Sequence, residues 1–224
     1  MIKLAHYGKD VIVKVFILVF ILALSALFVN NGIYKFIAIS LSAFLWIFTL
    51  YFFRDPDRKI PSGYKQNQLL SPGDGKVVVI ENVINREKNI FEEGEELTQI
   101  SIFLSPLNVH VNRIPVSGEV KYLNYVKGDY IVAFDHKSSE RNERSEIGIE
   151  DTSNGKKVLF KQIAGFVARR IVYDIKKGDM VRAGDRFGMI KFGSRIDILT
   201  SKKSLTLVEI GQKVKGGETI IAEL

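Results

Sequence analysis

Two long apolar stretches separated by a short polar turn dominate the first quarter of the chain. The first, residues 15–29, and the second, residues 36–53, carry no charged residue, and the Asn-Asn-Gly at 30–32 is typical of a turn. Counted from Ile33, the second stretch has 21 residues, about 31 Å as a helix, which is close to the thickness of a hydrocarbon core. Residues 1–58 are therefore predicted to form a membrane-anchoring transmembrane α-hairpin.

A cleavable signal peptide is the alternative interpretation of the first stretch. It would be cut within Ala23-Leu24-Ser25. The apolar run continues past this segment to Val29, so the hairpin is the favoured interpretation.

Basic residues are concentrated on the outer flanks of the two apolar stretches. These flanking residues are Lys3, Lys9, Lys14, Arg54, Arg58 and Lys59. The turn side has only Lys35. Because positively charged flanks favour the cytoplasmic side, the domain that follows is predicted to lie on the cytoplasmic side of the cell membrane.

After Asp55-Pro56, where the second helix is predicted to stop, the pattern changes to short β-branched runs. Residues 76–80, 98–104 and 158–160 have the composition of strands, and residues 162–171 resemble one buried strand that ends in two arginines. The acidic segment 92–96 is predicted to be an exposed loop.

The last third of the chain contains a weak repeat with the spacing G-x-x-V-x-x-G, at residues 178–184 and 211–217. Each copy precedes a strand-like run, as in the turns of barrel-sandwich hybrid domains such as biotin and lipoyl carriers. A carrier displays a lysine in its own hairpin motif, which this chain lacks, so the repeat is interpreted as architecture. Residues 59–224 are therefore predicted to form a mainly β domain with a barrel-sandwich or hybrid-like arrangement.

Composition excludes several kinds of chemistry. The chain has no cysteine, which excludes disulfides, zinc–thiolate sites and thiol nucleophiles, and its three histidines are far apart in sequence, so no metal site is predicted. The formal net charge of +7 is spread along the chain without an aromatic-basic stacking motif, so nucleic acid is not an expected partner. Attraction to anionic lipid headgroups and ordinary surface charge both account for the basic balance.

The pair Gly193-Ser194, within RFGMIKFGSRIDI (186–198), indicates the most specific chemistry. A serine hydroxyl in a strained turn can attack the preceding glycine carbonyl and shift the acyl group from nitrogen to oxygen. Loss of the ester by β-elimination and hydrolysis of the dehydroalanine then give a pyruvoyl group, a ketone that can condense with an amine. Alone, the pair is also typical of an ordinary turn, because glycine adopts positive φ and serine bonds the local backbone.

Further segments carry candidate residues, each with a structural alternative. Asp74 in SPGDGK (71–76) suits a turn before a strand, and His110 in FLSPLNVHVNRIP (103–115) suits a structural position in a β-like run. The segment KSSERNER (137–144) alone is typical of a solvated polar loop.

Together these segments resemble the phosphatidylserine decarboxylase proenzymes, specifically their short, membrane-anchored branch. The matching pieces, in the family's order, are FFRDP (52–56), SPGDG (71–75), NVHVNRIP (108–115), NER (142–144), QIAG with ARRI (162–165 and 168–171) and FGSR (192–195). Each piece is weak alone, whereas six in order are specific.

The resemblance implies self-cleavage between Gly193 and Ser194. The larger chain, residues 1–193, and the smaller chain, residues 194–224, would stay together as a heterodimer, and a higher oligomer is left open. The smaller chain would begin with the pyruvoyl group formed from Ser194. A Schiff base on this group would convert phosphatidylserine to phosphatidylethanolamine and CO₂, so the expected partners are phosphatidylserine and membrane lipids, with no metal or diffusible cofactor.

The resemblance also implies roles for three residues. Asp74 belongs to the set that promotes cleavage, and His110 matches a histidine near the pyruvoyl group, where it is the expected acid that protonates the α-carbon. Arg113 stands where the longer enzymes carry a second histidine linked to self-cleavage. An arginine stays protonated at neutral pH, so the cleavage base is left open. The partner of the lipid phosphate is left open among Arg113, Arg169, Arg170 and Arg195.

Two other functions are alternatives. A membrane-tethered serine hydrolase would use Ser194, His110 and Asp74 in a chain order found among serine proteases, although the nucleophile-elbow motif is missing. A non-enzymatic, membrane-anchored β module would make all of these residues turn or core positions. In both cases the chain would stay intact.

Overall fold

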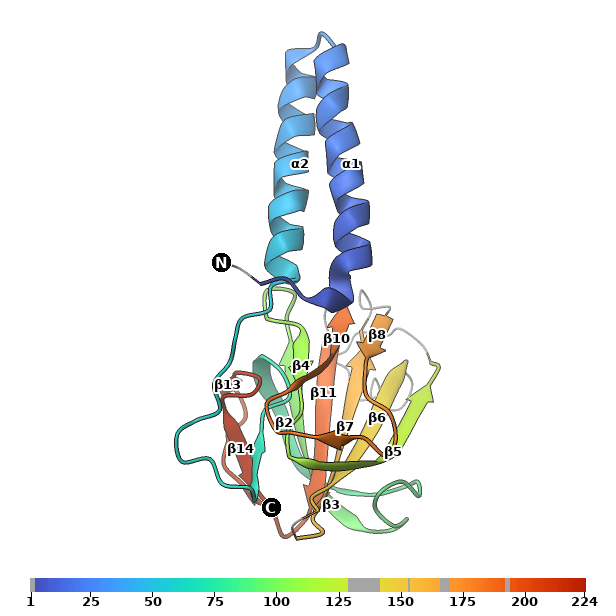
Figure 1. Cartoon of the computed structure of the whole chain (residues 1–224), viewed down its shortest axis with the longest axis vertical. Helices are drawn as coiled ribbons and strands as arrows, with labels where there is room; N and C mark the ends of the chain where they lie inside the picture. The colour runs from blue at the N-terminus through green and yellow to red at the C-terminus, as the bar shows by residue number, and fades with distance from the viewer. Residues whose placement is uncertain (1–2, 129–141, 153, 166–169, 192–193) are drawn as a thin grey trace. The chain divides into compact units, whose positions relative to one another are not determined.

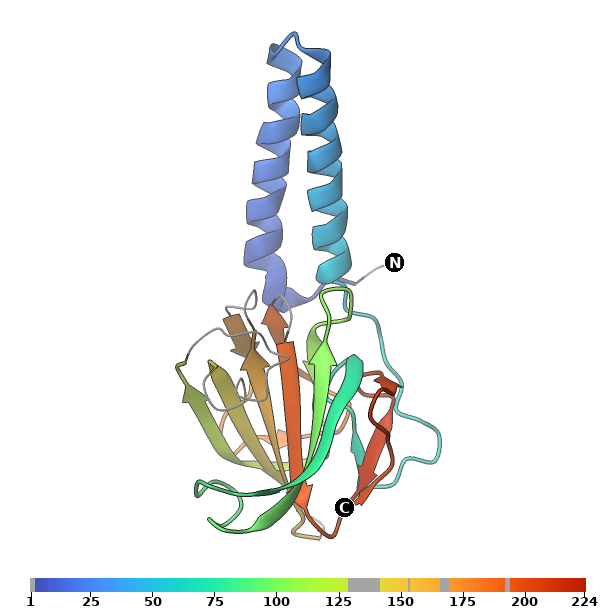
Figure 2. The same ribbon diagram turned by 180° about the vertical axis from the view of Figure 1, so that it is seen from behind.

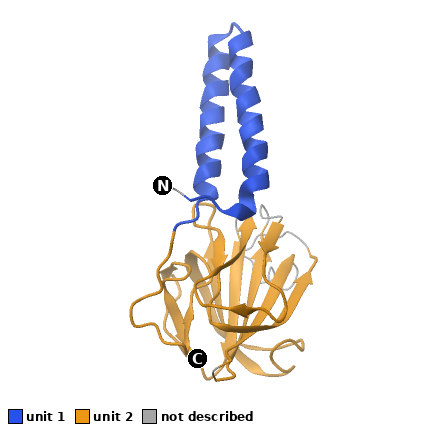
Figure 3. Ribbon diagram, viewed as in Figure 1, with its two compact units in different colours: residues 1–56 blue, residues 57–224 orange. Residues whose placement is uncertain are grey.

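The computed structural model (Figure 1, and from behind in Figure 2) describes residues 3–128, 142–152, 154–165, 170–191 and 194–224. The chain divides into two compact units, Met1–Pro56 and Asp57–Leu224 (Figure 3). The sequence predicts this boundary after residue 58, two residues further along. Arg58 belongs to the second unit, where it forms ion pairs with Asp74 and Glu218.

The first unit is a helical hairpin. A 3₁₀ turn, η1 (His6–Gly8), leads into α1 (Lys9–Phe28), and α2 (Gly32–Phe52) returns beside it. The Asn31 side chain caps α2 by accepting the backbone N–H of Tyr34 at 3.0 Å. Both helices are long and apolar enough to cross a membrane, as the two apolar stretches predict.

The second unit is built mainly from strands. They are β1 (Gln68–Leu70), β2 (Gly75–Ile84), β3 (Glu96–Leu104), β4 (Val111–Arg113), β5 (Gly118–Val126), β6 (Arg144–Glu150), β7 (Lys157–Ala164), β8 (Arg170–Tyr173), β9 (Met180–Val181), β10 (Arg186–Lys191), β11 (Ser194–Ser201), β12 (Leu205–Thr206), β13 (Lys213–Val214) and β14 (Ile220–Glu223). An eight-stranded curled sheet has the order β13-β2-β3-β11-β7-β6-β5-β9, and two three-stranded sheets have the orders β1-β14-β12 and β4-β10-β8. The predicted mainly β fold, preceded by two apolar helices, is confirmed.

The predicted strands are present, but one of them is divided. β2, β3 and β7 include the runs at 76–80, 98–104 and 158–160. The segment 162–171 is not one strand, because β7 ends at Ala164 in the eight-stranded sheet and β8 begins at Arg170 in a three-stranded sheet. The two parts pair with different neighbours, β11 and β10, and this divides the segment.

The repeat at 178–184 and 211–217 forms two similar turns. Each copy holds a two-residue strand, β9 or β13, between glycines with positive φ. These φ angles are 93° at Gly178, 84° at Gly184, 94° at Gly211 and 74° at Gly217. A side chain disfavours this conformation, so the repeated glycines fix the turns that precede β10 and β14.

The eight-stranded sheet has one apolar and one charged face in its centre. Since successive side chains of a strand point to opposite faces, residues of one parity share a face. The apolar face includes Ile102, Ile147, Phe160, Ile196 and Ile198, all buried in the main core. The opposite face includes Arg144, Lys161, Arg195 and Asp197, which line one cavity. Ser194 has the parity of the apolar face.

Candidate active site

Ser194 is the first residue of β11, in the interior of the eight-stranded sheet. It pairs with Leu104 of β3 on one side and with Ala164 of β7 on the other. Its side chain is fully buried, and its Oγ has no hydrogen-bond partner among the described residues. Such a buried hydroxyl costs about 1–3 kcal/mol, so a purely structural serine is poorly suited to this position. Its predicted cleavage partner, Gly193, lies outside the described residues.

The segment Asn142-Glu143 fixes the end of β7 opposite Ser194. The Asn142 Nδ2 donates to the Ala164 carbonyl at 2.7 Å, and the Ala164 N–H donates to the Glu143 carbonyl at 2.9 Å. The Tyr125 hydroxyl donates to the Glu143 carboxylate. Asn142 and Glu143 are buried, so this part of KSSERNER is a support of the site, although its composition is typical of a solvated loop.

Hydrogen bonds link three neutral side chains, from strands β6, β7 and β4, into a chain near the end of the sheet at which β11 begins. The Ser145 hydroxyl donates to Gln162 Oε1 at 2.7 Å, and Gln162 Nε2 donates to Asn112 Oδ1 at 2.7 Å. All three residues are fully buried. A Cβ placed on Gly73 would lie 3.3 Å from Asn112 Nδ2, so the chain reaches the segment that carries Asp74.

His110 lies directly before β4, fully buried. β4 pairs with β10, the strand that ends at Lys191 just before the Gly193-Ser194 pair. The His110 Nδ1 lies 3.0 Å from the Asn108 carbonyl oxygen. Because a carbonyl can only accept, Nδ1 carries the proton of this bond and Nε2 is the atom that can exchange one.

Asp74 lies directly before β2, on the other side of β3 from Ser194. The pairs Lys76–Phe103 and Leu104–Ser194 place the start of β2 and the start of β11 at the same end of the sheet. Two strand spacings separate them, roughly 10 Å between backbones. The Asp74 Oδ2 accepts from Arg58 Nη2 at 2.7 Å, and Oδ1 accepts the Gly216 N–H at 2.8 Å.

Arg113 and Arg58 line one cavity of about 400 Å³ together with residues 183–186. The Arg113 Nη1 donates to the Gly184 carbonyl at 2.9 Å. The Arg113 guanidinium is therefore held by a turn of the repeat, in the same cavity as Arg58, the cation that pairs with Asp74.

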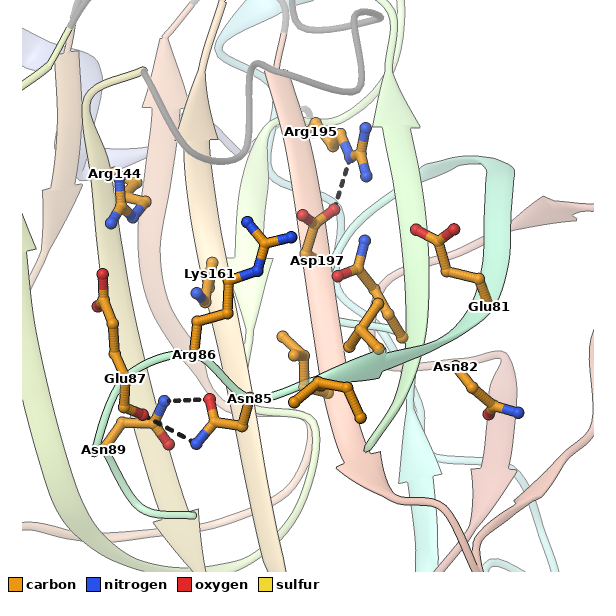
Figure 4. Close-up of a pocket in the computed structure, with 14 residues that line it drawn as sticks. Glu81, Asn82, Asn85, Arg86, Glu87, Asn89, Arg144, Lys161, Arg195 and Asp197 are labelled. Atoms are coloured by element: carbon orange, nitrogen blue, oxygen red, sulfur yellow. Dashed lines mark hydrogen bonds and ion pairs between the residues drawn. The ribbon is translucent and has the colours of Figure 1, made fainter. Parts of the chain in front are cut away.

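Arg195 lies on the opposite face of the sheet from the Ser194 side chain. Its Nε donates to Asp197 Oδ1 at 2.6 Å (Figure 4). Its Nη2 donates to the Ser101 hydroxyl at 2.8 Å. Over this face lies a cavity of about 710 Å³. The cavity therefore does not mark the Ser194 side chain, and Arg195 is a poor candidate for the lipid phosphate. Of the other candidates, Arg170 is exposed at the start of β8, and Arg169 lies outside the described residues.

Glu146 organises the charged face next to this cavity. Its Oε1 accepts from Arg144 Nε at 2.9 Å and lies 3.2 Å from Lys161 Nζ, and its Oε2 accepts from the Tyr122 hydroxyl at 3.2 Å. Burial raises the pKa of Glu146, but Lys161 and Arg144 outweigh it, so the pKa is lowered from its usual value of 4.5. Burial, and then the charge of Glu146, raise the pKa of Tyr122 above 10.0.

The structure brings Ser194, His110 and Asp74 to neighbouring segments, without a hydrogen bond from either partner to the Ser194 hydroxyl. This arrangement does not favour the serine hydrolase alternative, which needs a base in contact with the nucleophile. Within the described residues, no group of three or more His, Asp or Glu side chains could hold a metal ion.

Sequence reasoning missed Arg58 and the neutral chain through Gln162. Arg58 counts in the sequence as a flanking charge of the hairpin, whereas its partners Asp74 and Glu218 lie 16 and 160 residues away. Gln162 and Asn112 are 50 residues apart. Gln162 and Asn112 lie within the matched segments QIAG and NVHVNRIP, whereas Arg58 lies two residues beyond FFRDP.

Comparison with known proteins identifies the family. A phosphatidylserine decarboxylase family profile matches residues 45–222. The chain is 45% identical over 218 residues to the phosphatidylserine decarboxylase proenzyme of Pelodictyon phaeoclathratiforme, covering 96% of this chain and 97% of that protein. It is 45% identical over 219 residues to the proenzyme of Chlorobium luteolum, covering 98% and 99%, and 48% identical over 185 residues to that of Chlorobium limicola, covering 83% of each.

The second unit is a mainly β domain with a buried serine at the start of an interior strand. The chain belongs to the phosphatidylserine decarboxylase family.

Proposed function

We propose that this chain is a pyruvoyl-dependent carboxy-lyase that converts phosphatidylserine to phosphatidylethanolamine and CO₂ after cutting itself between Gly193 and Ser194. The observation that carries the proposal is the buried Ser194 hydroxyl, which has no hydrogen-bond partner among the described residues, in a chain that matches the family over residues 45–222. Family membership supports the reaction and argues against the serine hydrolase and the non-enzymatic module.

Self-cleavage needs only the chain and water. The Ser194 Oγ attacks the Gly193 carbonyl carbon, the peptide C–N bond breaks, and the hydroxyl proton ends on the Ser194 nitrogen. A base then removes the Ser194 α-proton while the Cβ–O bond breaks, so that Gly193 leaves as a carboxylate. The dehydroalanine takes up one water and releases ammonia, which leaves the pyruvoyl group at residue 194.

Two kinds of side chain are proposed to act with the pyruvoyl group: a histidine that donates a proton and arginines that bind the phosphate. The pyruvoyl group supplies an acceptor for the electron pair that the departing CO₂ leaves behind. His110 returns a proton to the α-carbon from Nε2, the ring atom that its Nδ1–Asn108 bond leaves to exchange. A cation that holds the substrate carboxylate too tightly would stabilise the ground state, so the arginines are better used on the phosphate. Of the four candidates, Arg195 is disfavoured by its buried bonds on the opposite face, and Arg113 by the carboxylates around its cavity, so Arg169 and Arg170 are retained.

Mass spectrometry of the purified protein tests self-cleavage. We expect two fragments, residues 1–193 and 194–224, with the smaller one reactive toward hydroxylamine or borohydride. Ser194→Ala should give one intact, inactive chain, whereas Ser194→Cys should keep some cleavage because a thiol can make the same acyl shift. Ser201→Ala, at the other end of β11, is the matched control and should be cut normally. Cleavage of the Ser194→Ala chain at this bond would overturn the mechanism.

The two fragments are proposed to stay together as a heterodimer. β11 of the smaller fragment pairs along its length with β3 and β7 of the larger one. We expect the fragments to copurify through a tag on either chain in detergent. Separation of the two under native conditions would contradict the heterodimer.

The helical hairpin is proposed to hold the β domain at the cytoplasmic face of the cell membrane. The basic outer flanks of its two apolar helices support this orientation. Protease added to intact cells should leave the β domain uncut. Protease added to permeabilised cells should digest it. Digestion in intact cells would reverse the orientation.

A further inference from the structure

Arg58 bridges two carboxylates from distant parts of the chain. It follows the end of α2 at Phe52 by six residues, yet its ion pairs lie in the β domain. Its Nη2 lies 2.7 Å from Asp74 Oδ2 and its Nη1 lies 3.1 Å from Glu218 Oε2. The Arg58 side chain is 11% exposed, so this is a largely desolvated, charge-assisted arrangement and not a surface pair.

The second oxygen of Asp74 is held by a turn of the glycine repeat. Asp74 Oδ1 accepts the Gly216 N–H at 2.8 Å. A Cβ on Gly216 would lie 3.1 Å from the Gly73 Cα, and a Cβ on Gly217 would lie 2.8 Å from the Arg113 Cδ. The turn therefore packs closely against the Asp74 segment, and both carboxylate oxygens of Asp74 are fixed in direction.

The surrounding charges indicate that this cluster organises a carboxylate and does not bind an anion. The arginines that line the cavity are Arg58, Arg113 and Arg186. The carboxylates in or directly bonded to its lining are Asp57, Asp74, Asp185 and Glu218. Three cations face four carboxylates, so a phosphate would meet net negative charge.

We propose that Arg58 is a positioning residue for self-cleavage, which keeps Asp74 ionised and aligned. The inference rests on the proposed self-cleavage. An adjacent positive charge favours the carboxylate form, and a guanidinium does not release its proton at neutral pH. Arg113 lines the same cavity and, like Arg58, stays protonated at neutral pH, so neither arginine can act as the base. Arg58 holds the Asp74 carboxylate in its ionised form.

The test measures the rate of cleavage against pH in full-length protein synthesised in a cell-free system with lipid vesicles. Arg58→Gln removes the charge and leaves a polar amide on a shorter side chain, and should slow cleavage at pH 7 by about 10- to 100-fold. The acid limb of its plot of cleavage rate against pH should move to higher pH, because Asp74 no longer has the Arg58 cation beside it. Arg58→Lys should recover most of the rate. Arg186→Ala, which breaks an ion pair with Asp57 in the same cavity, should cleave as the unchanged chain does.

The outcomes separate this inference from the proposed function. If the unchanged chain is not cut between Gly193 and Ser194, the proposed function fails. If it is cut and Arg58→Gln cleaves with the same rate and pH profile, the role of Arg58 is overturned. A rate loss equal at all pH values and not recovered by Arg58→Lys would show a structural role and also overturn it. Thermal unfolding of each variant in the Ser194→Ala background reports whether a rate loss follows loss of the fold.

Discussion

Ser194 and Arg195 are neighbours on β11, but they belong to two chemically different faces of one sheet. On the Ser194 face lie the hydrogen-bonded neutral side chains of Ser145, Gln162 and Asn112 and a hydroxyl without a partner among the described residues. On the Arg195 face, charged groups are buried in pairs, as with Asp197.

The comparison shows that the buried ion pairs of β6, β7 and β11 lie on the face opposite the Ser194 side chain, so none of them holds its hydroxyl. A buried charge is tolerated only with a partner, and a partner next to Ser194 would hold its hydroxyl away from the Gly193 carbonyl. On the Ser194 face, the Ser145–Gln162–Asn112 bonds hold three neutral side chains in place, and a separate bond from Asn142 fixes the backbone at Ala164. The unpartnered hydroxyl is a local cost of the kind expected at a functional site.

The largest expected effect is on chemistry at the Ser194 face. His110→Ala should lower decarboxylation about 10²–10⁴-fold in protein that has already been cut, because the general acid for the α-carbon is lost. Purifying the cleaved fraction and assaying CO₂ release isolates this step, and the rate of self-cleavage is measured separately. His6→Ala in the helical unit is the control and should be unaffected. Near-normal turnover would remove His110 from the mechanism.

Breaking the Arg195 face should act on stability. Asp197→Asn leaves the Arg195 guanidinium buried without its carboxylate, which should lower the free energy of unfolding by about 3–5 kcal/mol. Thermal unfolding followed by circular dichroism in detergent, on the uncut Ser194→Ala chain, measures the change. Asp57→Asn breaks an exposed ion pair with Arg186 and should change the free energy of unfolding by less than about 1 kcal/mol. Equal effects of the two substitutions would contradict the contrast between the faces.

The smallest effect is a pH dependence from Glu146. Its pKa in the folded chain is below the usual 4.5, so its ionised form stabilises the fold. This contribution is fully present above pH 4.5 and is lost as the pH falls through the lowered pKa. Glu146→Gln should therefore flatten the fall in melting temperature on the acid side of pH 4.5, while Glu81→Gln, on the rim of the same cavity, should not. If the melting temperature of Glu146→Gln falls below pH 4.5 as steeply as that of the unchanged chain, the fall comes from other carboxylates.

Sequence patterns predicted the elements that depend on neighbouring residues. The apolar runs gave α1 and α2, the β-branched runs gave β2, β3 and β7, and the glycine spacing gave the paired turns. The division of 162–171 was not predictable, because it depends on which strands pair with each half.

The candidate site was predictable in its residues but not in its contacts. Ser194, His110 and Asp74 follow from the motifs, whereas the partner of Asp74 does not. Arg58 is a hairpin-flanking charge by position, and only the fold brings it to a carboxylate 16 residues away. Likewise, Asn142 belongs to a polar stretch in the sequence, and only the fold brings its amide to the Ala164 carbonyl, 22 residues further along.

The interior position of β11 also determines what self-cleavage does to refolding. β11 pairs with β3 and β7, and β14 pairs with β1, so strands on the two sides of the proposed cut are interleaved throughout the domain. Before the cut, a denatured molecule can find these pairings by a first-order search within one chain. Afterwards it needs an encounter of two chains, so its recovery slows with dilution. Activation would thus convert a protein that can refold alone into one whose native state is kept by its unfolding barrier.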